Sequence, residues 1–98
     1  MARYHLNWEI EPARMAADPQ EIANSWKALA GMVKKDFEAG ALKDWGAYPG
    51  ERKGYAVVEG SEMDVLRFTM QYAPYVAFDV RPATNIDEVM EFLVSASG

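Results

Sequence analysis

The sequence predicts one α+β domain in which strands and helices alternate in the order β-α-β-β-α-β, followed by a third helix. Three observations support this fold class. A stretch near the start alternates apolar and polar residues with a period of two, which is typical of a half-buried strand. Two later stretches begin with helix-capping residues and continue with apolar residues spaced by three or four. Between those helices, two β-rich stretches flank a joint rich in turn-forming residues.

Length and composition limit both the architecture and the class of function. The chain has 98 residues, half of them hydrophobic, and no cysteine, which favours a single domain over residues 1–98. A net charge of −5 disfavours partners that are bound through phosphate groups, so we expect neither nucleic acid nor a membrane surface as a partner. No signal-peptide core or stretch of ~18 apolar residues is present, and we expect a cytoplasmic protein.

The first strand is expected over residues 3–10. Its two sides differ: Tyr4, Leu6, Trp8 and Ile10 form an apolar row, and Arg3, His5, Asn7 and Glu9 form a polar row. A connection over 11–17 contains Pro12. A helix then begins at Asp18-Pro19, because aspartate is a good capping residue and proline is favoured at the first helical position.

The stripe of this first helix and its end can be read from the spacing of residues. The apolar stripe consists of Ile22, Trp26, Leu29, Val33 and Phe37. Gly40 is expected to end the helix in a left-handed conformation. Gly31 lies in the middle of the helix, where it costs ~1 kcal/mol relative to alanine. Either this cost is tolerated or another group packs closely there.

The second half of the chain repeats a strand, helix and strand pattern. Residues 41–48 and 54–59 are expected to form a hairpin around the joint 49–53. Ser61 and Asp64 form a capping pattern for a second helix, which should stop at Ala73 because proline follows. This helix is apolar on two faces and therefore needs two packing partners.

A fourth strand and a third helix complete the expected elements. The strand covers residues 75–80, and Pro82 is expected to end it. Asn85 then begins the third helix, for which we expect four inward-facing residues: Ile86, Val89, Met90 and Leu93.

This order of elements is that of the ferredoxin-like split βαβ sandwich. In that fold the first and third strands lie at the centre of a four-stranded antiparallel sheet, and both main helices cover one face. The other face stays uncovered and usually finds a partner. We therefore expect a homodimer in which two sheets meet through these faces.

Residues 54–82, above all the joint Ala73-Pro74-Tyr75, resemble the second half of muconolactone-isomerase-like members of the dimeric α+β barrel superfamily. The first strand and residues 38–42 are similar to the small domains of unknown function in that group. The resemblance implies a dimer whose sheets form a barrel. It also implies cavities near the sheets, in which cofactor-free isomerases and oxygenases bind small organic acids or aromatic compounds. No catalytic motif matches residue by residue, so no catalytic role is carried over.

The polar row of the first strand is the main candidate for chemistry. His5, the only histidine, could act as acid/base, with Asn7 orienting a substrate oxygen and Glu9 tuning the imidazole. Alternatively, the row faces a wet dimer interface or pairs with Asp79 and Arg81 on the fourth strand, where an ion pair is more common than an anion clamp.

Aromatic residues of the hairpin are a second set of candidates. Trp45, Tyr48 and Tyr55 could stack on a flat ligand, or pack across strands and in a dimer contact. Trp8 and Trp26 are expected in the core. With one histidine, no cysteine and no glycine-rich phosphate loop, neither a metal nor a nucleotide cofactor is expected.

The sequence is compatible with two functions. The first is an uncharacterised dimeric barrel protein that binds a small organic or aromatic ligand or acts as an accessory subunit. The second is a cofactor-independent isomerase or monooxygenase that uses His5 as acid/base. An enclosed cavity around His5 would favour the enzyme.

Overall fold

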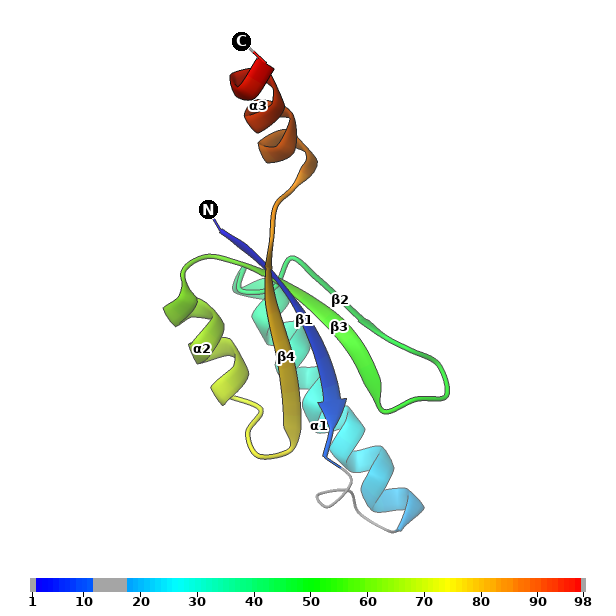
Figure 1. The fold of residues 1–98 in the computed structure, drawn as a ribbon. Helices are drawn as coiled ribbons and strands as arrows, with labels where there is room; N and C mark the ends of the chain where they lie inside the picture. The colour runs from blue at the N-terminus through cyan, green and yellow to red at the C-terminus, as the bar shows by residue number, and fades with distance from the viewer. Residues whose placement is uncertain (1, 12–17, 98) are drawn as a thin grey trace.

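The computed structural model describes residues 2–11 and 18–97, which form a four-stranded antiparallel sheet and three helices (Figure 1). The elements are β1 (Arg3–Ile10), α1 (Pro19–Glu38), β2 (Asp44–Ala47), β3 (Lys53–Glu59), α2 (Glu62–Met70), β4 (Val76–Ala83) and α3 (Ile86–Ser97). The predicted α+β class and order of elements are confirmed. Of the predicted connection 11–17, which contains Pro12, all but Glu11 lies outside the described residues.

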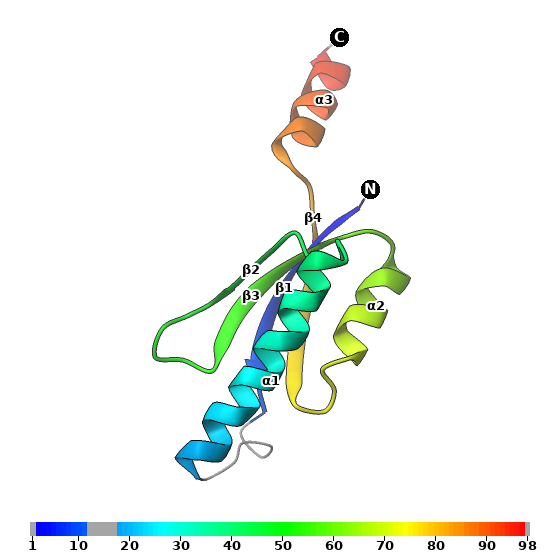
Figure 2. The same ribbon diagram turned by 180° about the vertical axis from the view of Figure 1, so that it is seen from behind.

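The strand order in the sheet is β2-β3-β1-β4, and all neighbouring strands are antiparallel. The prediction that the first and third strands are central is therefore confirmed. Both α1 and α2 lie on the same face of the sheet, as the view from behind shows (Figure 2). We call the opposite side of the sheet the open face; within residues 2–11 and 18–97, no helix covers it.

The core lies between the sheet and the two helices. Leu6 and Trp8 of β1 are 0% and 5% exposed, which follows from their place on the apolar side of a central strand. Val65 and Phe68 of α2 and Val33 of α1 complete the buried cluster from the helix side. Burial of each such side chain stabilises the fold by about 1.5–3 kcal/mol.

The predicted helix boundaries are largely confirmed. Ser61 and Asp64 form the expected capping box: the Ser61 Oγ accepts from the Asp64 N–H at 3.2 Å, and the Asp64 carboxylate accepts from the Ser61 N–H at 2.8 Å. Gly40 has a φ of 80° just after α1, as expected of a left-handed terminator. Asp18 is the N-cap of α1, although its side chain makes no capping hydrogen bond.

Three elements differ from the prediction in length. β2 covers only Asp44–Ala47, and α2 ends at Met70 instead of Ala73, because residues 71–75 form a turn. β4 continues through Pro82 to Ala83. Proline is tolerated there because β4 is an edge strand, whose outer side needs no ladder hydrogen bonds.

The prediction that α3 packs inward is wrong. Its four residues expected to face inward are exposed, from 37% for Val89 to 70% for Ile86. The reason is that β4 ends level with β1 and is followed only by Thr84 and Asn85, so α3 begins past the end of the sheet and projects away from it (Figure 1). The chain consequently extends 61 Å in its longest dimension, against 26 and 19 Å in the others.

A buried hydrogen bond ties α1 to the turn after α2. The Tyr72 hydroxyl donates to the Asp36 carboxylate at 2.7 Å, and both residues are buried. Desolvation, followed by the hydrogen bond and the negative charge of Asp36, raises the pKa of Tyr72 far above its ordinary value. The Asp36 backbone carbonyl also accepts from the Ala41 N–H at 2.9 Å, so this residue also anchors the chain that leaves α1.

We predict that Gly31→Ala stabilises the protein by about 1 kcal/mol, because alanine is the better helix former. A Cβ at this position meets no atom within 4 Å, so the mutation adds no clash. Gly40→Ala is the matched control and should destabilise, because the φ of 80° strains any residue with a side chain. Urea denaturation of the two variants measures both changes in the free energy of unfolding. If Gly31→Ala lowered it, glycine would be required at this position and not merely tolerated.

We predict that Tyr72→Phe lowers the free energy of unfolding by about 1–3 kcal/mol at neutral pH, because Asp36 loses its buried donor. The raised pKa of Tyr72 means that its contribution is complete below pH 10.0, the ordinary value, and is lost as the pH rises beyond it. The variant should therefore lose less stability than the wild type between neutral and strongly alkaline pH. Denaturation of both proteins at several pH values tests this. If the free energy of unfolding fell equally in both as the pH rises, the contribution of the Tyr72 hydroxyl would be excluded.

Candidate functional site

The polar row predicted on β1 lies on the open face, next to the expected residues of β4. The strand register places His5 opposite Arg81 and Asn7 opposite Asp79. On the other side of β1, Asn7 lies opposite Tyr55, and Glu9 lies opposite Lys53. Because directly opposed residues of antiparallel strands share a face, these side chains form one polar surface. Most of the predicted site residues are thus brought together.

His5 and Tyr55 are in ring contact on this surface. Their rings are stacked, with centroids 6.1 Å apart and an interplanar angle of 5°. Asp44 on β2 lies near, and its negative charge, together with some desolvation, raises the pKa of the Tyr55 phenol. Tyr55 therefore stays a hydrogen-bond donor at neutral pH.

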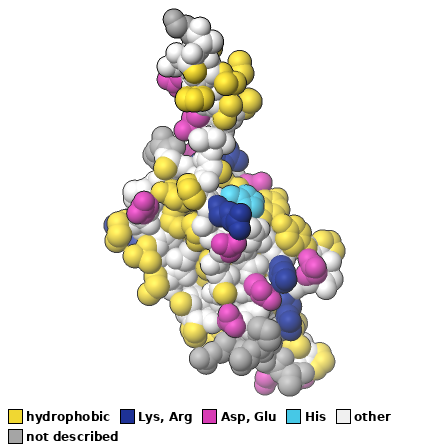
Figure 3. All heavy atoms as spheres, viewed as in Figure 1, with side chains coloured by type: hydrophobic (Ala, Val, Ile, Leu, Met, Phe, Trp, Pro, Cys, Tyr) yellow, Lys and Arg dark blue, Asp and Glu magenta, His cyan; other side chains and the backbone are white. Residues whose placement is uncertain are grey.

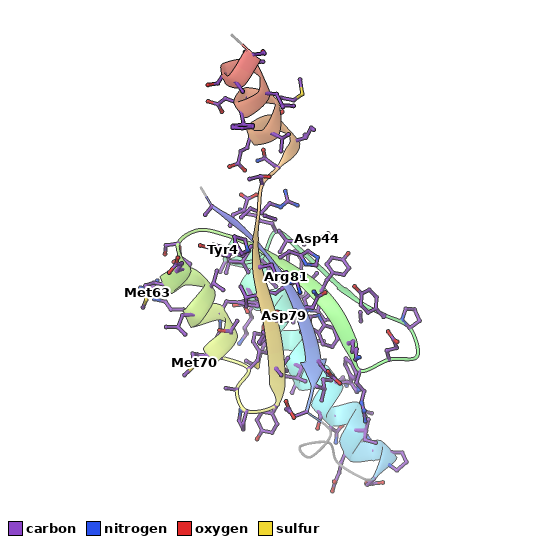
Figure 4. All side chains as sticks on the ribbon, in the orientation of Figure 1. Tyr4, Asp44, Met63, Met70, Asp79 and Arg81 are labelled. Carbon is purple, nitrogen blue, oxygen red and sulfur yellow. The ribbon has the colours of Figure 1, made fainter. Side chains whose placement is uncertain are left out.

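Asp79 and Arg81 form an ion pair with each other within β4 (Figure 4). The Arg81 Nη2 lies 3.6 Å from the Asp79 Oδ2, but the two side chains are 74% and 63% exposed. Such an exposed pair contributes little stability. Charged side chains of both signs gather on this side of the sheet in the space-filling view (Figure 3), so the open face is a polar, water-accessible surface.

Trp45 does not belong to this surface. It lies on the helix side of the sheet, where its ring stacks on Trp8 with centroids 5.3 Å apart and an interplanar angle of 10°. The register explains this position: Trp45 lies opposite Ala56, which shares a face with Leu6 and not with His5. Trp45 therefore lies on the opposite side of the sheet from His5, and its stacking on Trp8 agrees with the interpretation that it packs across strands.

A larger cavity of about 360 Å³ lies on the helix side, between α1 and the turn after α2. Its lining is mostly apolar and aromatic: Ile10, Ile22, Ser25, Trp26, Ala28, Leu29, Met32, Gln71, Tyr72 and Tyr75. A smaller, apolar cavity of about 40 Å³ lies next to it and shares Trp26, Leu29 and Tyr72 with it. His5 lines neither of these two cavities.

Two contacts hold the walls of the larger cavity in place. The Tyr75 carbonyl accepts from the Glu11 N–H at 2.8 Å, which fixes the turn after α2 to the end of β1. The hydrogen bond from Tyr72 to Asp36 fixes the same turn to α1. The wall therefore combines residues from β1, α1 and the turn after α2, all anchored by hydrogen bonds.

No local pattern in the sequence predicts this cavity. Trp26 and Leu29 belong to the apolar stripe of α1, which predicts packing but gives no sign of a space beside it. A weak signal existed: Ser25 and Ala28 are small residues beside the stripe, on the side of α1 that lines the cavity.

The chemistry of the two surfaces differs. The larger cavity offers apolar and aromatic walls with few polar groups, which suits a small organic molecule. Across residues 2–11 and 18–97, no group of three or more histidine, aspartate or glutamate side chains is placed to hold a metal ion. None of the helices in that part of the chain is both long enough and apolar enough to cross a membrane.

Comparisons with known proteins give the family and no activity. No curated protein matches the sequence significantly. A family model described as "Domain of unknown function (DUF3303)" matches residues 2–97, which is nearly the whole sequence. The chain belongs to this family of domains of unknown function, DUF3303.

Proposed function

We propose that this protein binds a small, largely apolar organic or aromatic molecule in the helix-side cavity, and that two copies pair through their open faces. The single observation that carries the binding proposal is the cavity of about 360 Å³ with its aromatic lining. Binding cavities for small molecules measure about 300–1,000 Å³ and are lined mainly by apolar and aromatic side chains with a few polar groups.

The lining suggests which kind of ligand fits. Trp26, Tyr72 and Tyr75 provide ring surfaces, and Leu29 and Met32 provide aliphatic contacts. Ser25 and Gln71 are the polar groups that could orient a hydroxyl or carboxylate of the ligand. The hydroxyl of Tyr72 already donates to Asp36, so Tyr72 contributes mainly its ring. A compact aromatic compound or small organic acid matches this environment.

We assign the single chain to the ferredoxin-like fold. Pairing of two such chains through their open faces would then form a dimeric α+β barrel. The strand order β2-β3-β1-β4 and the placement of α1 and α2 on one face support this assignment. The open face carries charges of both signs, such as Arg81 and Asp79, and can therefore be complementary to itself about a two-fold axis. The resemblance of residues 54–82 to muconolactone-isomerase-like proteins agrees with such a dimer.

The cofactor-independent enzyme with His5 as acid/base has less support. His5 is stacked on Tyr55 on the open face, whereas the two described cavities lie on the other side of the sheet. A ligand in the larger cavity is therefore separated from the imidazole by the sheet itself. A general base must lie within hydrogen-bond reach of the proton that it removes.

We predict that Ser25→Phe weakens ligand binding about tenfold or more, because the added ring occupies part of the cavity. The probes are 2-naphthol for aromatic compounds and benzoate for organic acids, followed by tryptophan fluorescence, since Trp26 lines the cavity. Ala23→Phe, at another exposed position of α1 outside the lining, is the matched control and should bind like the wild type. Equal affinity in both variants, or no saturable response of the wild type to either probe, would sink the binding proposal.

We predict that the wild type has twice the mass of the 11.0 kDa chain in light scattering at micromolar concentration. Asn7→Arg should shift it towards the monomer, because the new charge at the centre of the open face repels its copy across the two-fold axis. Asn24→Arg makes the same change on the exposed side of α1 and serves as the control. An association unaffected by Asn7→Arg argues against pairing through this face.

A further inference from the structure

The helix-side cavity of about 360 Å³ has an inner end and a rim, which its lining residues define by their exposure. Ile10 and Tyr72 are only 7% and 3% exposed, so they form the inner end. Ser25 and Gln71 are exposed and Tyr75 is 54% exposed, so these three residues form the rim. The turn after α2 lies beside α1 in the view from behind (Figure 2). The cavity therefore runs from the surface towards the core.

The inner end borders the smaller cavity of about 40 Å³, which lies further into the core. Four residues line both cavities: Ile10, Trp26, Leu29 and Tyr72. The remaining walls of the smaller cavity are apolar core side chains, among them Phe68 and Phe78. A group placed at the inner end would therefore contact mainly hydrocarbon and aromatic ring surfaces, which favours an apolar group.

Two hydrogen-bond donors near the inner end are already engaged within the protein. The Tyr72 hydroxyl donates to the Asp36 carboxylate at 2.7 Å, and the Trp8 Nε1–H donates to the Tyr55 carbonyl at 3.2 Å. Neither donor is therefore left to bond a ligand. A ligand hydroxyl at this end would lose its water and gain neither of these donors, which costs binding free energy.

The rim offers the opposite environment. Ser25 carries a hydroxyl, Gln71 an amide and Tyr75 a phenol, and all three groups can donate and accept hydrogen bonds. These residues are exposed, so water also reaches the rim. A polar group of a ligand placed there keeps hydrogen bonds with the protein or with water and does not incur the cost that it has at the inner end.

We propose that the ligand is a two-ring aromatic molecule that is polar at one end only, bound with its apolar end inward and its polar end at the rim. This inference rests on the proposed binding of a ligand in the same cavity. The volume indicates the size: a cavity of about 150 Å³ holds a benzene ring, and this one is more than twice as large. The contrast between the inner end and the rim sets the direction of the ligand.

The first test compares three ligands by titration calorimetry: naphthalene, 2-naphthol and 2,6-dihydroxynaphthalene, whose two hydroxyls lie at opposite ends of the ring system. We expect 2-naphthol to bind at least as tightly as naphthalene, because its hydroxyl lies at the rim. The second hydroxyl of 2,6-dihydroxynaphthalene must enter the inner end and should weaken binding about tenfold or more relative to 2-naphthol.

The outcomes separate this inference from the binding proposal on which it rests. If 2-naphthol binds and the second hydroxyl weakens binding no more than the first, the orientation is wrong although ligand binding stands. If neither naphthalene nor 2-naphthol gives a saturable response, both proposals fail.

The second test removes the polar groups of the rim. The double variant Ser25→Ala with Gln71→Leu should bind 2-naphthol about threefold or more weakly, because the ligand hydroxyl loses its protein partners. Naphthalene binding should not weaken in this variant, which also shows that the cavity is still folded. Asn24→Ala, an exposed position of α1 outside the lining, is the control and should bind both ligands like the wild type. Unchanged 2-naphthol binding in the double variant, or an equal loss for both ligands, would overturn the proposed orientation.

Discussion

The one-sided burial of the central strand β1 is the constraint on which the rest of the structure depends. Leu6, Trp8 and Ile10 face the helices and are almost fully buried, while the alternate residues face the other way. A shift of one residue in the register would bring Asn7 and Glu9 into the core and expose the apolar row. This penalty fixes the register with β3 and β4 and therefore decides which side chains can meet on each face.

The same constraint separates the two surfaces on which a function can be built. The helix side holds a cavity lined by α1 and the turn after α2, which the hydrogen bond from Tyr72 to Asp36 joins. The open face holds the histidine but stays accessible to water. Binding of an apolar molecule would therefore take place on one face of the sheet, and acid/base chemistry by His5 on the other.

Uncovered surface is the second general feature of this chain. The open face is polar and carries both signs of charge, whereas α2 exposes Met63, Leu66 and Met70 and α3 exposes one apolar side. Surfaces so different in character call for different contacts: the first suits a wet, charge-complementary interface, and the second suits close helix packing.

The sequence by itself determined the elements and much of the open face, because capping and alternation are local patterns. Ser61 with Asp64, Gly40, and the alternation over β1 all predicted what the structure contains. Asp79 and Arg81 lie beside the polar row of β1, as expected. Tertiary structure alone decided the rest. The cavity requires Ile10, Leu29 and Tyr75 at set distances from one another, and the face of Trp45 follows from its register with β3. The direction of α3 follows from its start just past the end of β4, beyond the sheet (Figure 1). Spaces and directions between elements depend on contacts between residues far apart in the chain, and no local pattern encodes them.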